Sequence, residues 1–358
     1  MTNLKTDNLY SWILFSTIIF LAGCQPKWNI QNPYADVNWN TDYRYKVNFH
    51  THTTCSDGRM NAQTVVDRYH RLGYGVLAIT DHNHVTYPWE SFSEMEASLS
   101  SKQRLTKGEL EEQDIVLENR YPEQLGMLAI QGNELSRHHH MGSYFNDHNG
   151  TETEEESLEA TSIKNGLVMF NHPGRYADKD PEKYNVNWYV DFFQRHQHLI
   201  GVEIYNQGDR YSNDRILYDA ILSQLMPDRP VWAYSNDDMH NGSRLGYNWN
   251  ELIIPELTQS RVRESMKEGR SFYIYSPQGH DGEIPEIQKI IVNNRKNTIQ
   301  MNVSGYDSIR WISGGNIIHR GALFSLKKHK NSEKYVRAEI FGPGNIIIGT
   351  QPFGIKEK

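Results

Sequence analysis

The segment FHTHTTCSDG, residues 49–58, places two histidines two positions apart and follows them with an aspartate. Side chains at positions i and i+2 of a β-strand point to the same face, so His50 and His52 are predicted to present their imidazoles side by side. Asp238 and His240 repeat this spacing in NDDMH. Imidazole and carboxylate groups are common ligands of transition metals. The two pairs therefore predict a metal site if other segments bring further ligands to it.

More histidines and acids stand at the ends of other predicted strands. They are Asp81 and His82 in AITDH, Glu134 in GNELS, the triplet His138, His139 and His140 before MGSYF, and His172 in FNHPG. A lone buried histidine is usually structural. Each buried imidazole or carboxylate needs a partner, however, and one shared cluster of cations would satisfy them all. The set as a whole predicts a metal centre.

The elements that must position these residues alternate between strand and helix. From residue 46 to 276, apolar runs such as GVLAIT, LVMF and GVEIYN alternate with amphipathic stretches such as NAQTVVDRYHRLG and DRILYDAILSQLM. This alternation predicts βα units, and seven candidate strands favour an α/β fold with a closed or nearly closed barrel. In such a barrel the C-terminal strand ends converge on one face, where active sites lie. The polar stretch from residue 88 to 126 is predicted to be a helical insertion.

The chain divides into four predicted segments. Residues 1–23 resemble a lipoprotein signal peptide, because an apolar run ends in Leu-Ala-Gly just before Cys24. Cys24 is the predicted lipidation site, with an ordinary secretory signal as the alternative, and residues 24–44 are predicted to be a polar tether. Residues 45–282 form the predicted barrel. Residues 283–358 show short alternating runs without helical periodicity, which predicts a small all-β, sandwich-like domain.

Composition and net charge limit the classes of binding partner that the sequence predicts. The chain has 358 residues, a net charge of −7 and no lysine-rich tract, which argues against a nucleic-acid backbone as an obligatory partner. If Cys24 is lipidated, Cys55 is alone and no intrachain disulfide forms. Cys55 is predicted to be a small buried residue, with a spare metal ligand as the alternative. Lipidation would anchor the protein to a bacterial membrane, in the periplasm or at the cell surface. No oligomeric state is predicted.

In this order and spacing, FHTHTTCSDG, AITDHN, GNELS, FNHPG and NDDMH resemble the motifs of the polymerase and histidinol phosphatase (PHP) family of metallophosphoesterases. The resemblance covers residues 46–276. It implies a distorted seven-stranded barrel, a centre of two or three metal ions, and hydrolysis of phosphate monoesters or diesters. The C-terminal domain likewise resembles the β tail of lipoprotein members of this family, where a packing role is the preferred interpretation.

The resemblance also implies the ligands. The first metal would be held by His50, His52 and Asp238, the second by His172 and His140, and a third by Asp57, His82 and His240. Glu134 would bridge the first two metals. RHHHMG does not define one register, so His139 is the alternative to His140. Glu134, Asp238 and His240 are the predicted catalytic residues.

The predicted chemistry is attack on phosphorus by a metal-activated hydroxide. Neutral imidazoles favour Zn, Mn or Fe over Mg, which prefers oxygen ligands. Phosphate oxygens that face away from the metals would bind a guanidinium. Arg175 is the first candidate, with Arg137 and Arg210 as alternatives, and His84 is predicted to contact substrate. Asp81 is predicted to be a ligand or to orient one, and Glu203 and Asn206 are predicted to support the ligands.

The expected substrate is a phosphorylated small molecule or a glycan-linked phosphate ester. Two other functions stay open at this point. The same centre could serve another metal-dependent hydrolase, because a fold does not determine a reaction. The chain could also be a non-catalytic surface binding lipoprotein whose β domain contacts glycans, although a decayed site would be expected to have lost ligands.

Overall fold

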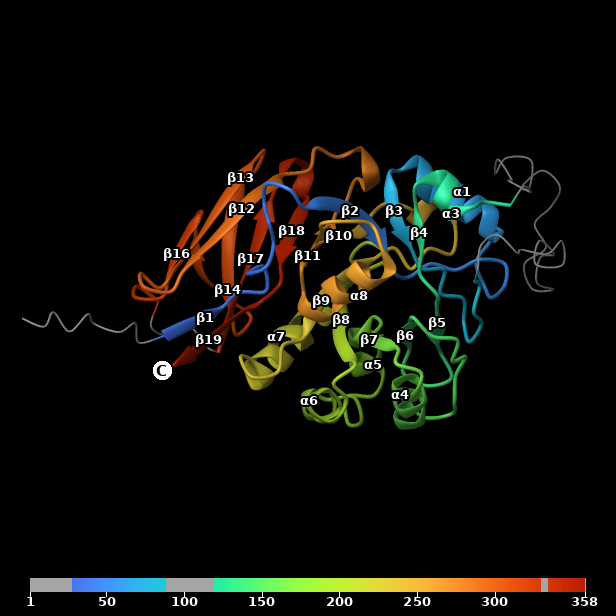
Figure 1. Ribbon diagram of the computed structural model, residues 1–358. Helices are drawn as coiled ribbons and strands as arrows, with labels where there is room; N and C mark the ends of the chain where they lie inside the picture. The colour runs from blue at the N-terminus through green and yellow to red at the C-terminus, as the bar shows by residue number, and fades with distance from the viewer. Residues whose placement is uncertain (1–27, 88–118, 330–333, 358) are drawn as a thin grey trace, which may run out of the picture.

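The computed structural model describes residues 28–87, 119–329 and 334–357. The predicted signal peptide, Cys24 and most of the predicted insertion, residues 88–118, lie outside the described residues. Figure 1 shows an elongated molecule, with the C-terminal strands at one end and helix-covered strands at the other. Hydrogen bonding groups the described strands into sheets of eleven, five and three.

One wall of the candidate site is a run of parallel strands within the largest sheet. Its order is β2, β3, β4, and β2 also pairs with the antiparallel strand β10. The bounds are β2 (Tyr43–Asn48), β3 (Tyr74–Leu77), β4 (Leu128–Ala129), β10 (Asn248–Ile254) and β11 (Ser271–Tyr275).

The opposite wall is the five-stranded sheet, in the order β5-β6-β7-β8-β9. Its bounds are β5 (Gly132–Leu135), β6 (Met141–Tyr144), β7 (Leu167–Phe170), β8 (Leu199–Asn206) and β9 (Trp232–Asn236). Every residue of these five strands is buried. The parallel pairs β7–β8 and β8–β9 carry the near-continuous apolar runs that are typical of strands covered on both faces.

Two isolated parallel bridges link the two walls, Thr51 with Met239 and His82 with Glu134. The strands that were expected to form one barrel are therefore divided between two sheets. The predicted mixed α/β fold is confirmed, and a single closed seven-stranded barrel is not. Strand pairing is interrupted just beyond β2, β3 and β9, where polar side chains point inward. Residues whose side chains point to a common centre depart from the regular geometry of paired strands.

Helices cover the outer faces of these strands (Figure 1). Their bounds are α1 (Ala62–Arg71), α3 (Pro122–Leu125), α4 (Glu154–Ile163), α5 (Pro173–Lys179), α6 (Val186–Arg195), α7 (Asn213–Leu225), α8 (Gln259–Glu268), and the 3-10 turns η2 (Gly242–Arg244), η3 (Gly279–Asp281) and η4 (Pro343–Asn345). Four helices begin at a side chain that accepts a backbone hydrogen bond, namely Asn61, Thr153, Asn185 and Thr258. Each such cap contributes about 1 kcal/mol.

The described part of residues 283–358 contains strands and no α-helix, as predicted. The strands are β12 (Glu286–Asn293), β13 (Thr298–Ser304), β14 (Ser308–Ser313), β15 (Asn316–Arg320), β16 (Leu323–Ser325), β17 (Tyr335–Phe341), β18 (Ile347–Thr350) and β19 (Phe353–Glu357). Trp311 of the large sheet stacks on Phe324 of the three-stranded sheet at 5.1 Å. The large sheet crosses the predicted boundary at residue 282, because β18 pairs with β11.

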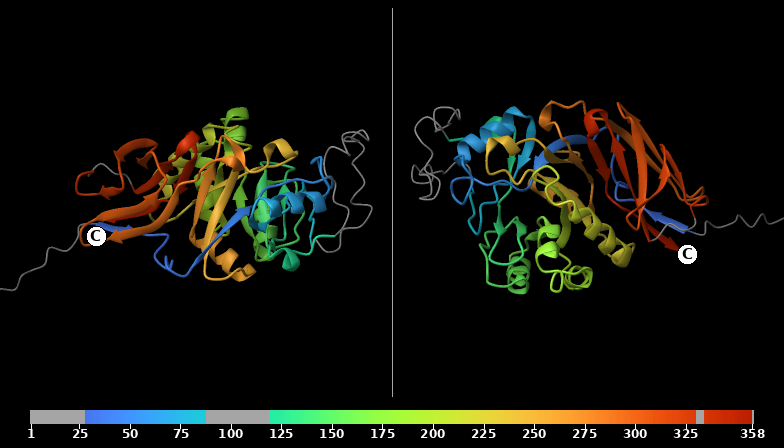
Figure 2. Two further views of the ribbon diagram at one scale, coloured as in Figure 1. Left: turned by 90° about the horizontal axis from the view of Figure 1, so that it is seen from above. Right: turned by 180° about the vertical axis from the view of Figure 1, so that it is seen from behind.

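The predicted polar tether is folded over its described part. β1 (Trp28–Gln31) pairs with β19 at the edge of the C-terminal strands (Figure 2). Tyr34 is buried and donates its hydroxyl to the carbonyl of Ser271, 3.0 Å away. The prediction of a tether is therefore wrong from residue 28 onward. Sequence polarity misled it, because a short edge strand needs few apolar residues.

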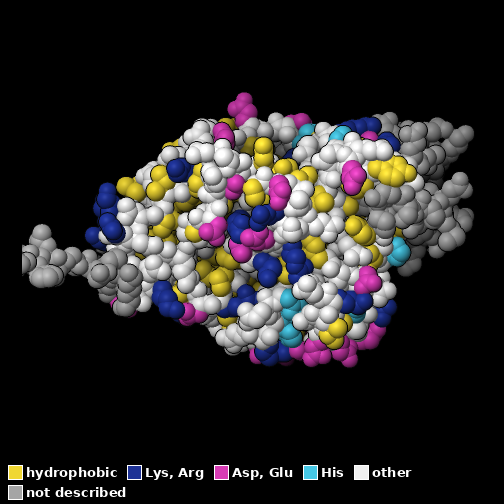
Figure 3. Space-filling model, in the orientation of Figure 1, with side chains coloured by type: hydrophobic (Ala, Val, Ile, Leu, Met, Phe, Trp, Pro, Cys, Tyr) yellow, Lys and Arg dark blue, Asp and Glu magenta, His cyan; other side chains and the backbone are white. Residues whose placement is uncertain are grey.

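On the face seen in Figure 3, Lys and Arg are interspersed with Asp and Glu and form no continuous basic stripe. In the part of the chain that the structure describes, no helix is both long and apolar enough to cross a membrane.

Candidate metal centre

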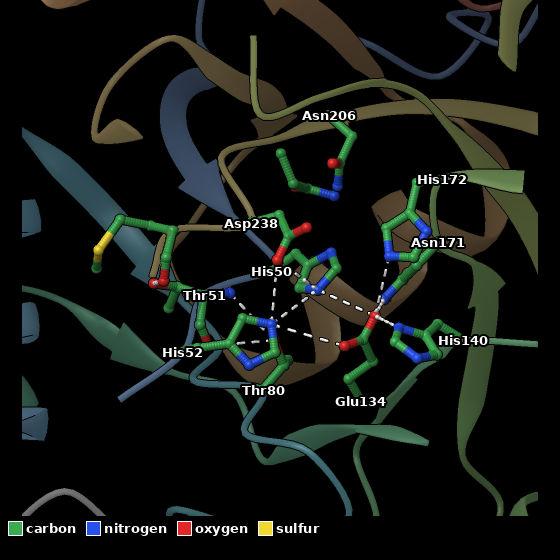
Figure 4. A network of polar contacts seen from close by, with 12 residues as sticks. His50, Thr51, His52, Thr80, Glu134, His140, Asn171, His172, Asn206 and Asp238 are labelled. Atoms are coloured by element: carbon green, nitrogen blue, oxygen red, sulfur yellow. Dashed lines mark hydrogen bonds and ion pairs between the residues drawn. The ribbon is translucent and has the colours of Figure 1, made fainter. Parts of the chain in front are cut away.

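All nine predicted ligands converge between the two walls. Figure 4 shows His50, His52, Glu134, His140, His172 and Asp238 of this set. His50 and His52 follow β2, Glu134 lies in β5, His172 follows β7, and Asp238 follows β9. Their ligand atoms form four overlapping groups, each within 4.8 Å: His52, Asp57, His82 and His240; His50, His172 and Asp238; His50, His52 and Glu134; and His82, Glu134 and His140. The convergence inferred from the strand ends is thus present in the structure.

Glu134 lies at the middle of the cluster, and its two carboxylate oxygens face different histidines. Oε1 lies 3.2 Å from Nε2 of His50, 3.2 Å from Nδ1 of His140 and 3.4 Å from Nε2 of His172. Oε2 lies 2.9 Å from Nδ1 of His82 and 3.6 Å from Nε2 of His52. A carboxylate with histidines gathered at both oxygens has the arrangement needed to bridge two cations.

Asp238 and Asp57 stand on either side of His52. Asp238 Oδ1 lies 3.3 Å from His50 Nε2 and 3.1 Å from His52 Nε2. Asp57 faces His82 and His240, at 3.4 and 3.2 Å from their Nε2 atoms. The side chain of Asp57 is 47% exposed whereas that of Asp238 is 7% exposed, so the Asp57 group forms the open side of the centre.

The protonation preferences of these groups reflect strong attraction between acids and imidazoles. Burial opposes ionisation of Glu134, but the neighbouring His140 and His50 outweigh it and hold the pKa of this carboxyl well below its usual value. Burial also disfavours charge on His82, yet the nearby carboxylates of Asp57 and Glu134 raise its pKa to about 10. Such a cluster stabilises positive charge placed among its carboxylates.

Several buried ligand atoms form no hydrogen bond, although three of them lie between 2.9 and 3.2 Å from the nearest oppositely charged ligand. They are Nδ1 of His82, Nδ1 of His140, Nδ1 of His172 and Oδ1 of Asp238. Buried polar atoms normally form hydrogen bonds. Nitrogen and carboxylate atoms that gather at one place without hydrogen bonds therefore indicate a position for a cation. Imidazole nitrogens and carboxylate oxygens are the donors that Zn, Mn and Fe accept. The residues present therefore fit divalent metal ions.

Glu203 supports two of the histidines from behind. Its carboxylate is fully buried and accepts Nδ1–H of His50 at 2.8 Å and the backbone N–H of His172 at 3.0 Å. Asn206 and Asn236 donate to the same carboxylate, at 3.0 and 2.8 Å. The first contact leaves Nε2 of His50 free to face the cluster, as is usual for a metal-bound histidine. The predicted supporting role of Glu203 and Asn206 agrees with these contacts.

Asp81 is not part of the cluster. Its two oxygens accept from the backbone N–H and hydroxyl of Thr53, both at 2.7 Å, and from the hydroxyls of Ser56 and Thr86, both at 2.6 Å. The ligand alternative for Asp81 is therefore wrong, and this residue instead shapes the loop that follows His52. Gly58 in the same loop has no room for a side chain, because a Cβ there would lie 2.5 Å from the backbone of His52.

The structure separates the three histidines of the triplet. His140, the preferred ligand of the three, faces Glu134. His139 is buried in an aromatic box, stacked on Tyr176 at 4.0 Å, with Nε2 hydrogen-bonded to the hydroxyl of Tyr189. His138 bonds to the hydroxyl of Ser157. His139 is thereby excluded as the alternative ligand. Cys55 is partly exposed and belongs to none of the four groups, so the spare-ligand alternative is not supported.

The two residues predicted to bind substrate lie outside the cluster. His84 and Arg175 are both exposed. The guanidinium of Arg175 lies 5.7 Å from the ring of Tyr176, which in turn lies 6.0 Å from the ring of His172. Arg137 pairs with Glu152 on the surface. The assignment of His84 and Arg175 to substrate stays a prediction.

Sequence reasoning missed Gln207, which contacts a ligand directly. Its amide donates to Oδ2 of Asp238 at 2.9 Å, and its own oxygen accepts from Arg210 at 2.6 Å. Arg244 donates to the backbone carbonyl of Gln207 at 3.2 Å. Gln207 has a backbone φ of 47°, a value that residues other than glycine rarely adopt. A polar run after a buried strand, YNQGDR, was the available signal.

The fold and the site together define a mixed α/β protein with a buried histidine–carboxylate cluster suited to metal ions. No family model matches the sequence, and a search of curated proteins finds no match. The chain is similar to a two-domain protein containing a predicted PHP-like metal-dependent phosphoesterase from Bacteroides vulgatus, with 15% identity, a TM-score of 0.49, and coverage of 90% of this chain and 88% of that chain.

A second similar structure is the lesion-specific endonuclease PfuEndoQ from Pyrococcus furiosus. It has 14% sequence identity and a TM-score of 0.40. The match covers 63% of this chain and 56% of that chain. Both likenesses are remote. The functional argument below therefore depends on the residues of this chain.

Proposed function

We propose that this chain is a metal-dependent phosphoesterase of the PHP family, acting on phosphate monoesters or diesters. The observation that carries the proposal is the buried carboxylate of Glu134, which has histidines at both of its oxygens and unpaired buried ligand atoms around it. Two cations held a few ångströms apart by one bridging carboxylate suit hydrolysis of an ester whose oxygens are negatively charged. In this proposal the two walls are the halves of a distorted barrel.

The distances support three metal positions. We assign His50, His52 and Asp238 to the first, His140 and His172 to the second, and Asp57, His82 and His240 to the third, with Glu134 between the first two. When bound, the ions supply charge that binds phosphate oxygens and lowers the pKa of a bound water, to about 7 for zinc. The imidazole-rich set favours Zn, Mn or Fe.

The protein's own side chains then orient the metal ligands and neutralise charge on the phosphate. Glu203 keeps the proton of His50 on Nδ1, so that Nε2 remains a ligand. His240 and Asp57 lie on the open side, where the leaving group would depart. In the part of the chain that the structure describes, Arg210 and Arg244 have no carboxylate partner, and both contact Gln207 beside Asp238. We propose that their guanidinium groups bind the outward phosphate oxygens.

We further propose lipid anchoring at Cys24, which would place the enzyme outside the cytoplasm. The proposal rests on the apolar run and the Leu-Ala-Gly-Cys order of residues 21–24. Mass spectrometry of the mature N-terminus from bacterial cells would test it. A diacylglycerol-modified Cys24 is expected, and an unmodified residue after a different cleavage point would contradict it.

Metal content and phosphatase activity of the chain from residue 25 onward test the proposed function. We expect two or three metal ions per chain and release of nitrophenol from bis-p-nitrophenyl or p-nitrophenyl phosphate with added Mn or Zn. His50→Ala should lose metal and activity, whereas His70→Ala, at an exposed histidine of α1, should keep both.

Each other outcome has a definite meaning. Bound metal without hydrolysis of either ester would contradict the phosphoesterase and favour another metal-dependent hydrolase, to be tried on amide substrates. Absence of metal under all conditions would contradict the centre itself and favour a binding protein.

A further inference from the structure

A hollow of about 430 Å³ lies between α7 and the C-terminal strands, separate from the metal centre. Arg215 and Asp219 of α7 line one side, and Arg310, Arg337 and Glu339 of β14 and β17 line the other. Figure 3 shows basic and acidic side chains gathered near the centre of this face. The hollow is large enough for a small organic molecule.

Two of the three arginines in the hollow are already neutralised. Arg337 is buried and binds both oxygens of Asp219, at 2.9 and 2.7 Å, and an oxygen of Glu339 at 2.7 Å. Arg215 forms a two-point contact with Asp209. Their charges are therefore satisfied within the protein.

Arg310 differs from both. No carboxylate among the described residues pairs with it, and its buried Nε–H has no hydrogen-bond acceptor. Its guanidinium lies 3.9 Å from the ring of Phe341, a contact that uses the face of the group and leaves its edge N–H donors available. β15 places Arg320 directly opposite Arg310, and like charges at such positions repel. β17 places Glu339 opposite it on the other side, but that carboxylate is hydrogen-bonded to Arg337. Among the arginines that line the hollow, Arg310 is thus the one without a carboxylate ion pair in the described residues, and such a guanidinium suits an external anion.

The rest of the hollow is apolar at its rim. Ile216 of α7 and Ile317 of β15 are 70% and 46% exposed, which is unusual for isoleucine, and both line the hollow. Ile312 lines it from β14. The site therefore combines one available guanidinium with exposed branched aliphatic side chains.

We propose that this hollow binds a small organic carboxylate, with its anionic end on Arg310 and its aliphatic body between Ile216 and Ile317. Guanidinium groups match a carboxylate in a planar two-point contact, and the aliphatic rim gains stability when a hydrocarbon body excludes water from it. The ligand would bridge α7 and the C-terminal strands. This site does not depend on the proposed hydrolytic function.

Binding of sodium hexanoate to the purified protein, followed by isothermal titration calorimetry, tests the site. Hexanamide is the matched neutral probe and should bind at least about tenfold more weakly, because it cannot form the charge-assisted contact. Arg310→Gln should weaken hexanoate binding by about tenfold or more. Arg295→Gln, at an exposed arginine in the turn between β12 and β13, should leave it unchanged.

A second pair of variants tests the rim without altering Arg310. Ile216→Asp places a negative charge at the mouth of the hollow and should weaken hexanoate binding severalfold. Ile163→Asp makes the same change at an isoleucine of α4 that is 86% exposed and should have no effect. Hexanoate binding that is absent in the wild type, equal to that of hexanamide, or unaffected by both Arg310→Gln and Ile216→Asp would overturn the proposal.

Discussion

Two buried clusters of charged groups within the described residues differ in whether their charges are paired. At the junction of α7 and β17, Arg337 meets Asp219 and Glu339 at hydrogen-bond distance, and the hydroxyl of Tyr335 donates to Asp219 at 2.6 Å. Burial opposes the charge on Arg337, but Asp219 outweighs it and holds the pKa of this guanidinium well above its usual value. The junction therefore pairs these buried charges within the protein.

The metal centre does not. Glu134, Asp238 and their histidines lie as close together, yet four buried ligand atoms have no hydrogen-bond partner. Three ligand or neighbouring positions, His172, Gln207 and Asp238, also have φ between 33° and 47°, a region that costs free energy for residues other than glycine. Strain and unpaired atoms indicate a site arranged for something it binds, whereas the complete network at the junction indicates a structural one.

The largest expected effect separates the two clusters by function. Glu134→Gln removes the bridging charge, so we expect loss of bound metal and a fall in phosphatase activity of about a thousandfold or more, since metal ions supply several kcal/mol of charge stabilisation. Far-ultraviolet circular dichroism should remain that of the wild type. Metal analysis and p-nitrophenyl phosphate assays measure the effect. Near-normal metal content in this variant would contradict the bridging assignment.

The converse variant acts at the junction. Arg337→Met leaves Asp219 and Glu339 buried without their partner, which typically costs 3–5 kcal/mol, so we expect urea unfolding to show a loss of about that size. Activity per folded molecule should change little. Arg295→Met, at an exposed turn, is the control and should stay within about 0.5 kcal/mol of the wild type. A loss below about 1 kcal/mol in Arg337→Met would show that the network is not structural.

The ligands could be predicted from sequence because spacing on a strand determines which side chains share a face. His50 and His52 illustrate this. The same spacing, counted from His240, points to Asp238 and not to Asp237. The structure gives a physical reason, since Asp237 faces away and accepts from the backbone of residues 246–248 and from Tyr69. Burial raises the pKa of Asp237 to about 6, although these hydrogen bonds oppose it.

Contacts between distant segments could not be predicted in this way. Arg337 and Asp219 are 118 positions apart, and no local pattern relates them. The same applies to β1, which folds only because β19 offers a free edge. Arg175 and His84 were chosen by their nearness in sequence to ligands, but such nearness does not determine where a side chain points, either in a helix, as for Arg175 in α5, or in a loop, as for His84. Closure of the barrel depends on pairing at strand ends, where polar ligands replace the apolar signal.

A smaller effect tests how the centre is supported. Glu203→Gln keeps the shape of the side chain but removes the charge that holds the proton of His50 on Nδ1. Loss of such a supporting carboxylate typically costs 10–100-fold in metal affinity or activity, and we expect a loss of about that range. Competition with a metal chelator measures it. Glu251→Gln, on β10 of the eleven-stranded sheet, is the control. Equal metal affinity in both variants would mean that Glu203 only fills space.

The smallest effect concerns a partly buried group with no opposite charge beside it. Burial, aided by His196, lowers the pKa of His198 to about 4, below the value of about 6.5 in an unfolded chain. Its contribution to stability is therefore complete above pH 6.5 and is lost as the pH falls through 4. We expect the thermal midpoint of His198→Gln to depend less on pH between about 6.5 and 4 than that of the wild type. His70→Gln, at an exposed histidine, should follow the wild type. Parallel pH profiles for all three proteins would contradict the inference that the partly buried His198 stays neutral because it lacks a counter-charge. The loss of stability in acid would then be attributed to the carboxylates of the metal centre.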